Sequence, residues 1–166
     1  AARTTEADTA RRSADSARQD SDNAQARNRA LEAELKALNA KQTPRGMVIT
    51  VGDVLFDTDR AEIKSGGTRN LEQLVAFLKT YPLRKAEIEG FTDNTGSNGH
   101  NLDLSGRRAD AVLAALVDMG IARDRLSARG YGEAYPVAGN TNTTGRQMNR
   151  RVEIVLSDEV GRVFSR

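Results

Sequence analysis

The first forty residues carry small or apolar side chains at alternating steps of four and three positions. They include no Gly, no Pro and no aromatic residue, and they are rich in Ala, Arg, Asp, Glu, Gln and Ser. Such steps define a heptad repeat, which lines one face of a helix. We therefore predict an extended helix that carries this stripe. The stripe consists of Ala10, Ala14, Ala17, Ser21, Ala24, Asn28, Leu31, Leu35 and Leu38.

Two interpretations of this helix are open: a solvated, partly frayed spacer and a weak coiled coil. Ala, Ser and Asn bury little apolar area, so self-association through residues 10–38 should be weak. Forty helical residues would span about 60 Å. The Thr-Pro-Arg-Gly segment at residues 43–46 breaks the pattern, because Pro and Gly both interrupt helices. We therefore assign residues 1–45 to a helical spacer and residues 46–166 to a separate domain.

Beyond Gly46 the pattern switches between the two-residue alternation of strands and the 3.6-residue period of helices. Pro82 and Gly120 end the two expected helices. Two main helices on one face of a mixed sheet of about four strands form a two-layer α/β (α+β) sandwich. The polar stretch over residues 132–145 is expected to be a long loop. Strands are expected over residues 47–51, 85–92, 125–131 and 151–156, and helices over residues 68–81 and from about 104 to 119.

Composition narrows the class of protein. The chain has 166 residues, of which 29% are charged and 38% hydrophobic, as in a soluble globular domain with an appendage. It contains no apolar run long enough to cross a bilayer as a helix. It begins with Ala and shows no signal-peptide pattern, so we expect a fragment or a mature form. Cys is absent, which excludes disulfides, and a net charge of +2 is too small to indicate a nucleic-acid partner.

The segment from Phe91 to Val112 contains the most informative chemistry. Asp93 follows the end of an apolar strand, and Arg108 lies on the helix that comes next. An acid and a base near one helix N-terminus can bind a ligand that carries both an ammonium and a carboxylate. The ammonium would face Asp93. The carboxylate would meet backbone N–H groups and the planar guanidinium of Arg108.

Both residues also have a simpler structural interpretation. Asp often caps a turn, and composition alone favours that role for Asp93. Arg108 could be an exposed helix arginine like its neighbour Arg107. However, Leu104 and Ala111 flank Arg108 on the inner stripe. Arg108 should therefore point towards the sheet edge, where an arginine needs a fixed anion.

The same segment, TDNTGSNGHNLDLSGRRADAV, resembles the signature of OmpA-like peptidoglycan-binding domains. Three further blocks resemble that family in the expected order: FDTDRAEI at residues 56–63, GIARDRLSARGYGEAYP at residues 120–136 and NRRVEI at residues 149–154. The similarity covers residues 46–157 and implies a βαβαβ core. It also aligns Asp93 with the acid that contacts a ligand's ammonium, and Arg108 with the arginine that binds its carboxylate.

The resemblance extends the expected ligand site to four further residues. Thr92 would add a hydroxyl, and Asn101 would either tie the loop backbone or touch the ligand. Leu104 is most simply a core residue. Arg151 resembles a motif arginine, for which a salt bridge near the site is the modest interpretation.

Two acids and a histidine complete the candidate residues. Asp57 and Asp59 resemble the family's first binding-side loop, although turn formation explains them at least as well. His100 stands where the family often has an aromatic residue, and it is the only His in the chain. With one His and no Cys, we expect neither a metal site nor a catalytic Ser-His-Asp or Cys-His set. We therefore expect a binding module without a cofactor, and not an enzyme.

The function implied by the resemblance is non-covalent binding of peptidoglycan through the diaminopimelate of its stem peptide. The protein would lie in the periplasm and tether the outer membrane or an envelope complex to the wall, for example as a lipoprotein. Its further partners would be outer-membrane or envelope proteins. The alternative is a wall-anchoring subunit of a flagellar stator or a secretion system. A third hypothesis, a cell-wall hydrolase, has no nucleophile or metal set to support it.

Overall fold

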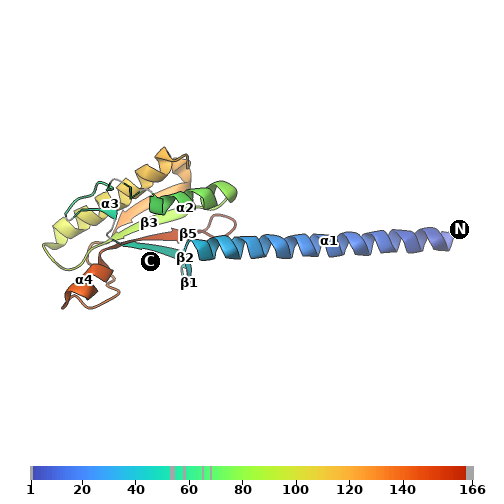
Figure 1. Ribbon diagram of the computed structural model, residues 1–166, viewed down its shortest axis with the longest axis horizontal. Helices are drawn as coiled ribbons and strands as arrows, with labels where there is room; N and C mark the ends of the chain where they lie inside the picture. Colours follow the sequence, from blue (N-terminus) through green and yellow to red (C-terminus); the bar gives the residue numbers. More distant parts are fainter. Residues whose placement is uncertain (1, 53–54, 58, 65, 68, 164–166) are drawn as a thin grey trace. The chain divides into compact units, whose positions relative to one another are not determined.

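The chain separates into two compact units between Ala37 and Leu38 (Figure 1). The computed structural model describes residues 2–52, 55–57, 59–64, 66–67 and 69–163. The first unit is the helix α1 (Ala2–Ala37), in which the side chains of residues 5–30 are exposed. Within the described part of the chain, no helix is both long enough and apolar enough to span a membrane.

The second unit begins with a hairpin that the sequence pattern does not predict. Strand β1 (Lys41–Thr43) pairs antiparallel with strand β2 (Gly46–Gly52). The turn between them uses Gly46, whose φ of 110° lies in a region that glycine adopts without steric cost. Residues 41–43 thus form part of the sheet, whereas the pattern places them in the helical spacer.

The sheet has five strands in the order β1-β2-β5-β3-β4. Strand β5 (Arg151–Leu156) lies between β2 and β3 (Ala86–Phe91) and runs antiparallel to both. Strand β3 pairs in parallel with β4 (Leu126–Gly130), which follows the short 3-10 helix η2 (Arg123–Arg125). The predicted mixed sheet and α+β class are confirmed, and β1 accounts for the additional strand.

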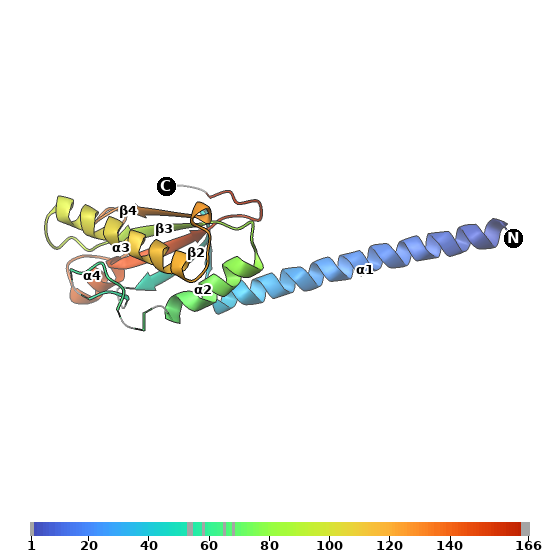
Figure 2. The ribbon, with the colours of Figure 1, turned by 90° about the horizontal axis from the view of Figure 1, so that it is seen from above.

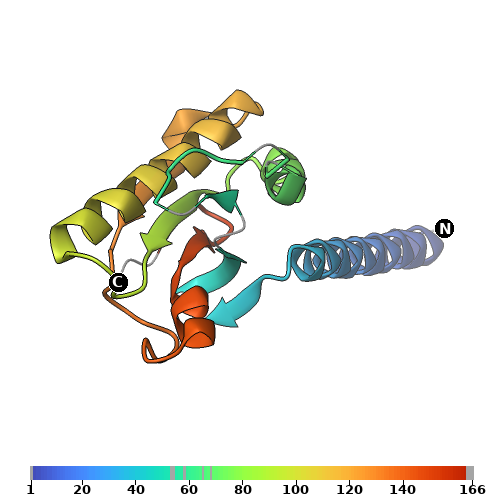
Figure 3. The same cartoon turned by 60° about the vertical axis from the view of Figure 1, so that its left-hand side comes forward.

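Helices α2 (Arg69–Thr80) and α3 (Asn98–Asp118) cover one face of this sheet (Figure 3). Thr68, the expected first residue of α2, lies outside the described residues. Helix α3 begins earlier than its apolar stripe, because its first turns are polar and Ser97 caps it by accepting a hydrogen bond from the N–H of His100. The core between helices and sheet contains Leu71, Leu74, Leu78, Ile88, Val112, Leu116 and Ile154.

Two glycines let α3 approach the sheet closely. Seen from above, α3 runs alongside β3 and β4 (Figure 2). A Cβ at Gly90 would overlap the carbonyl group of Ser105, and a Cβ at Gly130 would overlap the backbone of Gly106. This contact fixes α3 against the strand end from which Asp93 emerges.

The stretch expected to be a long loop ends in a helix, α4 (Thr143–Asn149). The Oδ1 of Asn142 caps α4 by accepting a hydrogen bond from the N–H of Gly145 at 2.6 Å. Asn149 at the other end is fully buried, and its amide bonds to the backbone of Val137 and Ala138. Polar contacts therefore hold α4, which is why apolar periodicity does not reveal it.

Candidate functional site

A cleft of about 400 Å³ opens at the carboxyl end of β3. Four segments contribute to it: the loop around residues 56–59, the end of β3 with the turn that follows, α3, and α4. A concave site with a few convergent polar groups is the usual form of a ligand-binding site. The cleft is lined by Phe56, Asp57, Asp59, Thr92, Asp93, Thr95, Asn101, Leu104, Arg108, Thr143, Arg146 and Arg150.

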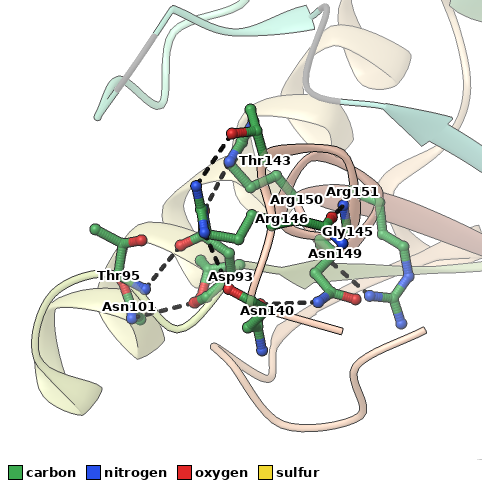
Figure 4. Close-up of polar contacts among 12 residues, drawn as sticks. Asp93, Thr95, Asn101, Asn140, Thr143, Gly145, Arg146, Asn149, Arg150 and Arg151 are labelled. Atoms are coloured by element: carbon green, nitrogen blue, oxygen red, sulfur yellow. Dashed lines mark hydrogen bonds and ion pairs between the residues drawn. The ribbon is translucent and has the colours of Figure 1, made fainter. Parts of the chain in front are cut away.

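Asp93 lies two residues beyond the end of β3 and is only 7% exposed. Its Oδ1 accepts a hydrogen bond from the N–H of Thr95 at 2.8 Å, and its Oδ2 accepts one from Nη1 of Arg150 at 2.7 Å (Figure 4). Burial raises the pKa of the Asp93 carboxyl, but the hydrogen bonds from Thr95 and Arg150 together lower the pKa by more than burial raises it. The pKa therefore lies below the ordinary value of 3.8. Asp93 is therefore both a turn cap and an ionised acid in the cleft.

Arg108 is buried on α3 and points inward, as its place on the apolar stripe predicts. Its Nε donates to the carbonyl of Arg60 at 2.9 Å, and Nη2 donates to the carbonyl of Asp57 at 3.3 Å. Its guanidinium carbon lies 5.1 Å from the centre of the Phe56 ring. In contrast, Arg107 is half exposed and pairs with Asp103 one turn earlier. Only Arg108 of the two reaches the cleft.

Thr92, Asn101 and Leu104 all line the cleft and are all buried. The Oγ1 of Thr92 donates to the carbonyl of Asp93 at 2.8 Å, and Nδ2 of Asn101 donates to the same carbonyl at 3.4 Å. Asn101 thus ties the loop backbone, one of its two expected roles. These contacts hold the main chain of Asp93 in place beneath its carboxylate.

Arg151 lies apart from these residues. It is the first residue of β5, and its guanidinium carbon lies 4.0 Å from the centre of the Phe91 ring. It donates to the carbonyls of Asn149 and Tyr135 and lies 3.5 Å from Glu153. Arg151 therefore does not line the cleft, whereas its neighbour Arg150 does and pairs with Asp93. The backbone turns from helix to strand between the two, so adjacent arginines point to different places.

The loop acids also reach the cleft. Asp57 lies 3.5 Å from Nζ of Lys64, and Asp59 lies 3.4 Å from Nε2 of His100. Thr58, between them, lies outside the described residues. Within the part of the chain that the structure describes, no group of three or more His, Cys, Asp and Glu side chains is placed to bind a metal ion.

Sequence reasoning missed the contribution of α4 to this site. Thr143, Arg146 and Arg150 line the cleft beside Asp93. One feature of the sequence could have indicated this helix: Asn142 precedes a Thr-Thr-Gly-Arg segment, and Asn is a preferred helix N-cap residue. Apolar periodicity carries no such signal.

Comparison with known sequences gives a consistent set of relatives. Residues 55–150 match the sequence profile of the OmpA family. Outer membrane porin F of Pseudomonas aeruginosa is 42% identical over 108 residues, which cover 64% of this chain and 31% of the porin. The peptidoglycan-binding protein ArfA of Mycobacterium tuberculosis is 39% identical over 109 residues, which cover 66% of this chain and 33% of ArfA. This chain thus spans about a third of the length of these curated relatives.

Solved structures show the same fold. A MotB-like protein from Desulfovibrio vulgaris superposes with a TM-score of 0.66 at 29% identity, covering 77% of this chain and 93% of that protein. The cell wall anchor of the T6SS from Pseudomonas aeruginosa superposes with a TM-score of 0.63 at 27% identity, covering 83% of this chain and 96% of that protein.

Proposed function

The chain belongs to the OmpA family, and we propose that it binds peptidoglycan non-covalently through the cleft at the end of β3. One observation carries the proposal: the cleft brings the ionised carboxylate of Asp93 and the guanidinium of Arg108 to the same cavity. The relatives support the ligand class, since ArfA is named as a peptidoglycan-binding protein and the T6SS component as a cell wall anchor.

The ligand group that fits these two charges is a free amino-acid centre, such as that of diaminopimelate in the stem peptide. Its ammonium would lie against Asp93, and its carboxylate would meet the planar fork of Arg108. Thr92 and Asn101 would act mainly by fixing the main chain at Asp93. We do not assign Arg151 a direct contact, because its guanidinium packs on the face of the Phe91 ring and it does not line the cleft.

The role of the protein would be to hold rather than to transform the wall. We propose a periplasmic location, with α1 as a spacer between the wall-binding unit and an outer-membrane or envelope partner. Lipoproteins and outer-membrane proteins occur among the relatives, including the probable lipoprotein YiaD of Escherichia coli, 40% identical over 105 residues. We propose weak self-association through residues 10–38, because the part of the stripe from Ala10 to Asn28 is exposed on α1.

A second candidate is a wall-anchoring subunit of a flagellar stator or a secretion system. The likeness to a MotB-like protein and to the T6SS anchor favours it, because both cover most of this chain. Both candidates use the same wall-binding cleft and differ in the complex that α1 would serve.

Co-sedimentation of the full chain with purified, insoluble peptidoglycan tests the proposal. We expect the protein to pellet with the wall without releasing soluble fragments. A soluble stem peptide containing diaminopimelate should displace it, because that peptide carries the free amino-acid centre. The matched peptide with lysine at the same position should displace it poorly, because its side chain ends in an ammonium without the carboxylate. Equal displacement by the two peptides would contradict the assignment of the amino-acid centre.

A further inference from the structure

Three arginines line the cleft: Arg108 on α3, Arg146 on α4 and Arg150 at the end of α4. Arg146 and Arg150 are connected by one helical turn in which the N–H of Arg150 donates to the carbonyl of Arg146 at 3.1 Å. Residues four apart on a helix lie about 5–6 Å apart at their Cβ atoms. Arg150 is held by Asp93 at 2.7 Å, and Arg146 lines the same cleft one helical turn earlier in the chain.

The contacts of Arg146 are with neutral groups. Its Nη1 donates to the carbonyl of Asn140 at 3.1 Å, and its Nη2 donates to Oγ1 of Thr143 at 3.2 Å. Among the described residues, no carboxylate lies within ion-pair distance of Arg146. A guanidinium carries five N–H donors, so Arg146 retains donors for an anion that enters the cleft.

The three acids of the cleft, unlike Arg146, each have a basic side chain within ion-pair distance. Asp57 has Lys64, Asp59 has His100, and Asp93 has Arg150 within ion-pair distance. The carboxylates repel an anionic group of a ligand, whereas the half-exposed guanidinium of Arg146 attracts it. Such a group would therefore bind at Arg146. Three carboxylates in the lining disfavour a doubly charged phosphate, whereas a single carboxylate matches the planar fork of arginine.

The segment that presents Arg146 is fixed in place. The buried amide of Asn149 accepts from the N–H groups of Val137 and Ala138 and donates to the carbonyl of Ala138 and Oδ1 of Asn140. Thus Asn140, which receives a hydrogen bond from Arg146, is itself held by the far end of α4 (Figure 4). A Cβ at Gly145 would overlap the carbonyl of Gly139, so the first turn of α4 packs directly on this loop. Such preorganisation lowers the entropic cost of binding.

We propose that Arg146 binds a second carboxylate of the stem peptide, beside the amino-acid centre that Asp93 and Arg108 hold. The inference rests on the proposed function and deepens it. The cleft then recognises a ligand with one ammonium and two carboxylates, and Arg146 distinguishes the stem peptide from a simple amino acid.

Calorimetric titration of the full chain with a soluble diaminopimelate-containing stem peptide tests this inference. Each carboxyl group outside the free amino-acid centre is amidated in turn, so the separate peptides identify which carboxylate is bound. For the wild-type protein, one of these amidations should weaken binding about 10- to 100-fold, the range expected for one charge-assisted hydrogen-bonded contact. Arg146→Gln should weaken binding of the unmodified peptide to a similar extent, and Arg107→Gln, on the exposed side of α3, should not.

The decisive result is the combination of the two changes. Arg146→Gln should bind the unmodified and the amidated peptide equally, because the variant no longer senses the carboxylate. Wild-type affinity that is insensitive to every amidation would overturn the inference, whether or not the variant folds. An Arg146→Gln variant that keeps its sensitivity to amidation would overturn it as well. If the wild-type protein binds no stem peptide at all, the proposed function fails instead.

Discussion

At the scale of single residues, the proposed ligand binding depends on Asp93 and Arg108. Conservative substitutions separate the charges of these two side chains from their structural roles. Asp93→Asn keeps the size of the side chain and an acceptor for the N–H of Thr95, but it removes the charge that an ammonium needs. We expect peptidoglycan binding to weaken by about 2–5 kcal/mol, because the ligand's ammonium is left without its counter-charge. Co-sedimentation at a series of protein concentrations measures the loss, and thermal melts verify that the variant folds.

Arg108→Lys tests the geometry with which the protein binds the ligand's carboxylate. An ammonium keeps the charge but cannot offer two parallel donors to a carboxylate, so wall binding should again fall strongly. Arg107→Ala is the matched control, since the exposed pair between Arg107 and Asp103 contributes about 0.3–0.5 kcal/mol to stability and does not reach the cleft. If the Arg107 and Arg108 variants lose binding equally, the inward orientation of Arg108 does not explain recognition.

The lowered pKa of Asp93 predicts a pH dependence of stability with a defined sign. Because the folded-state pKa lies below 3.8, ionised Asp93 stabilises the fold at pH values above the unfolded pKa, and this contribution is lost as the pH falls through the folded pKa. The difference in unfolding free energy between wild type and Asp93→Asn should therefore be constant near neutral pH and should shrink below about pH 4. Urea unfolding of both proteins over that range measures it. A difference that grows towards acid would show that the carboxyl is destabilised by its surroundings.

The sequence pointed to these two residues and to their neighbours Thr92, Asn101 and Leu104, but not to the residues around α4 that line the same cleft: Thr143, Arg146 and Arg150. Periodicity placed Arg108 on the inner face of a helix, which is a local property of the chain. The pairing of Asp93 with Arg150 joins residues 57 positions apart. It depends on how α4 meets β5, so the sequence pointed equally well to Arg151, which packs on Phe91 instead.

At the scale of elements, the apolar stripes predicted α2, α3 and the four longer strands, because each buries a regular face. Strand β1 escaped prediction because it has three residues and no buried apolar side chain. Helix α4 was not predicted because it is held by its N-cap and by the buried amide of Asn149, and not by an apolar face. Strand β1 is defined by its pairing with β2, and α4 by polar contacts, and such short polar segments show no period from which to infer them.

The hairpin of β1 and β2 predicts where the chain can be shortened. Deletion of residues 1–37 should leave the second unit folded and able to bind the wall, since the structure divides at Ala37. Deletion of residues 1–45 should destabilise it, because this also removes β1 and Arg45, whose guanidinium makes two hydrogen bonds of 2.6 and 2.7 Å to the fully buried Glu89. Breaking a buried ion pair costs about 3–5 kcal/mol. Thermal melts of the two truncated proteins should differ clearly, and equal melting temperatures would contradict this assignment of the boundary.

At the scale of the whole molecule, the two units differ in kind. The second unit has an apolar core and a charged cleft, whereas α1 exposes its side chains over residues 5–30. A helix of 36 residues is about 54 Å long at 1.5 Å per residue, which suits a spacer. The exposed side chains of residues 5–30 are what the proposed spacer role requires, and the cleft of the second unit is what the proposed wall binding requires.

The most direct test of the central claim is to map the ligand onto the chain by NMR. Amide chemical shifts of the full chain would be followed during titration with a diaminopimelate-containing stem peptide. We expect the largest changes at the end of β3, in the first turns of α3 and in α4, around Asp93, Asn101 and Arg146. A second hollow, lined by residues including Met47, Arg84 and Ser157, provides an internal comparison and should stay unchanged. Changes concentrated at that second hollow, with Asp93 and its neighbours unaffected, would contradict the account.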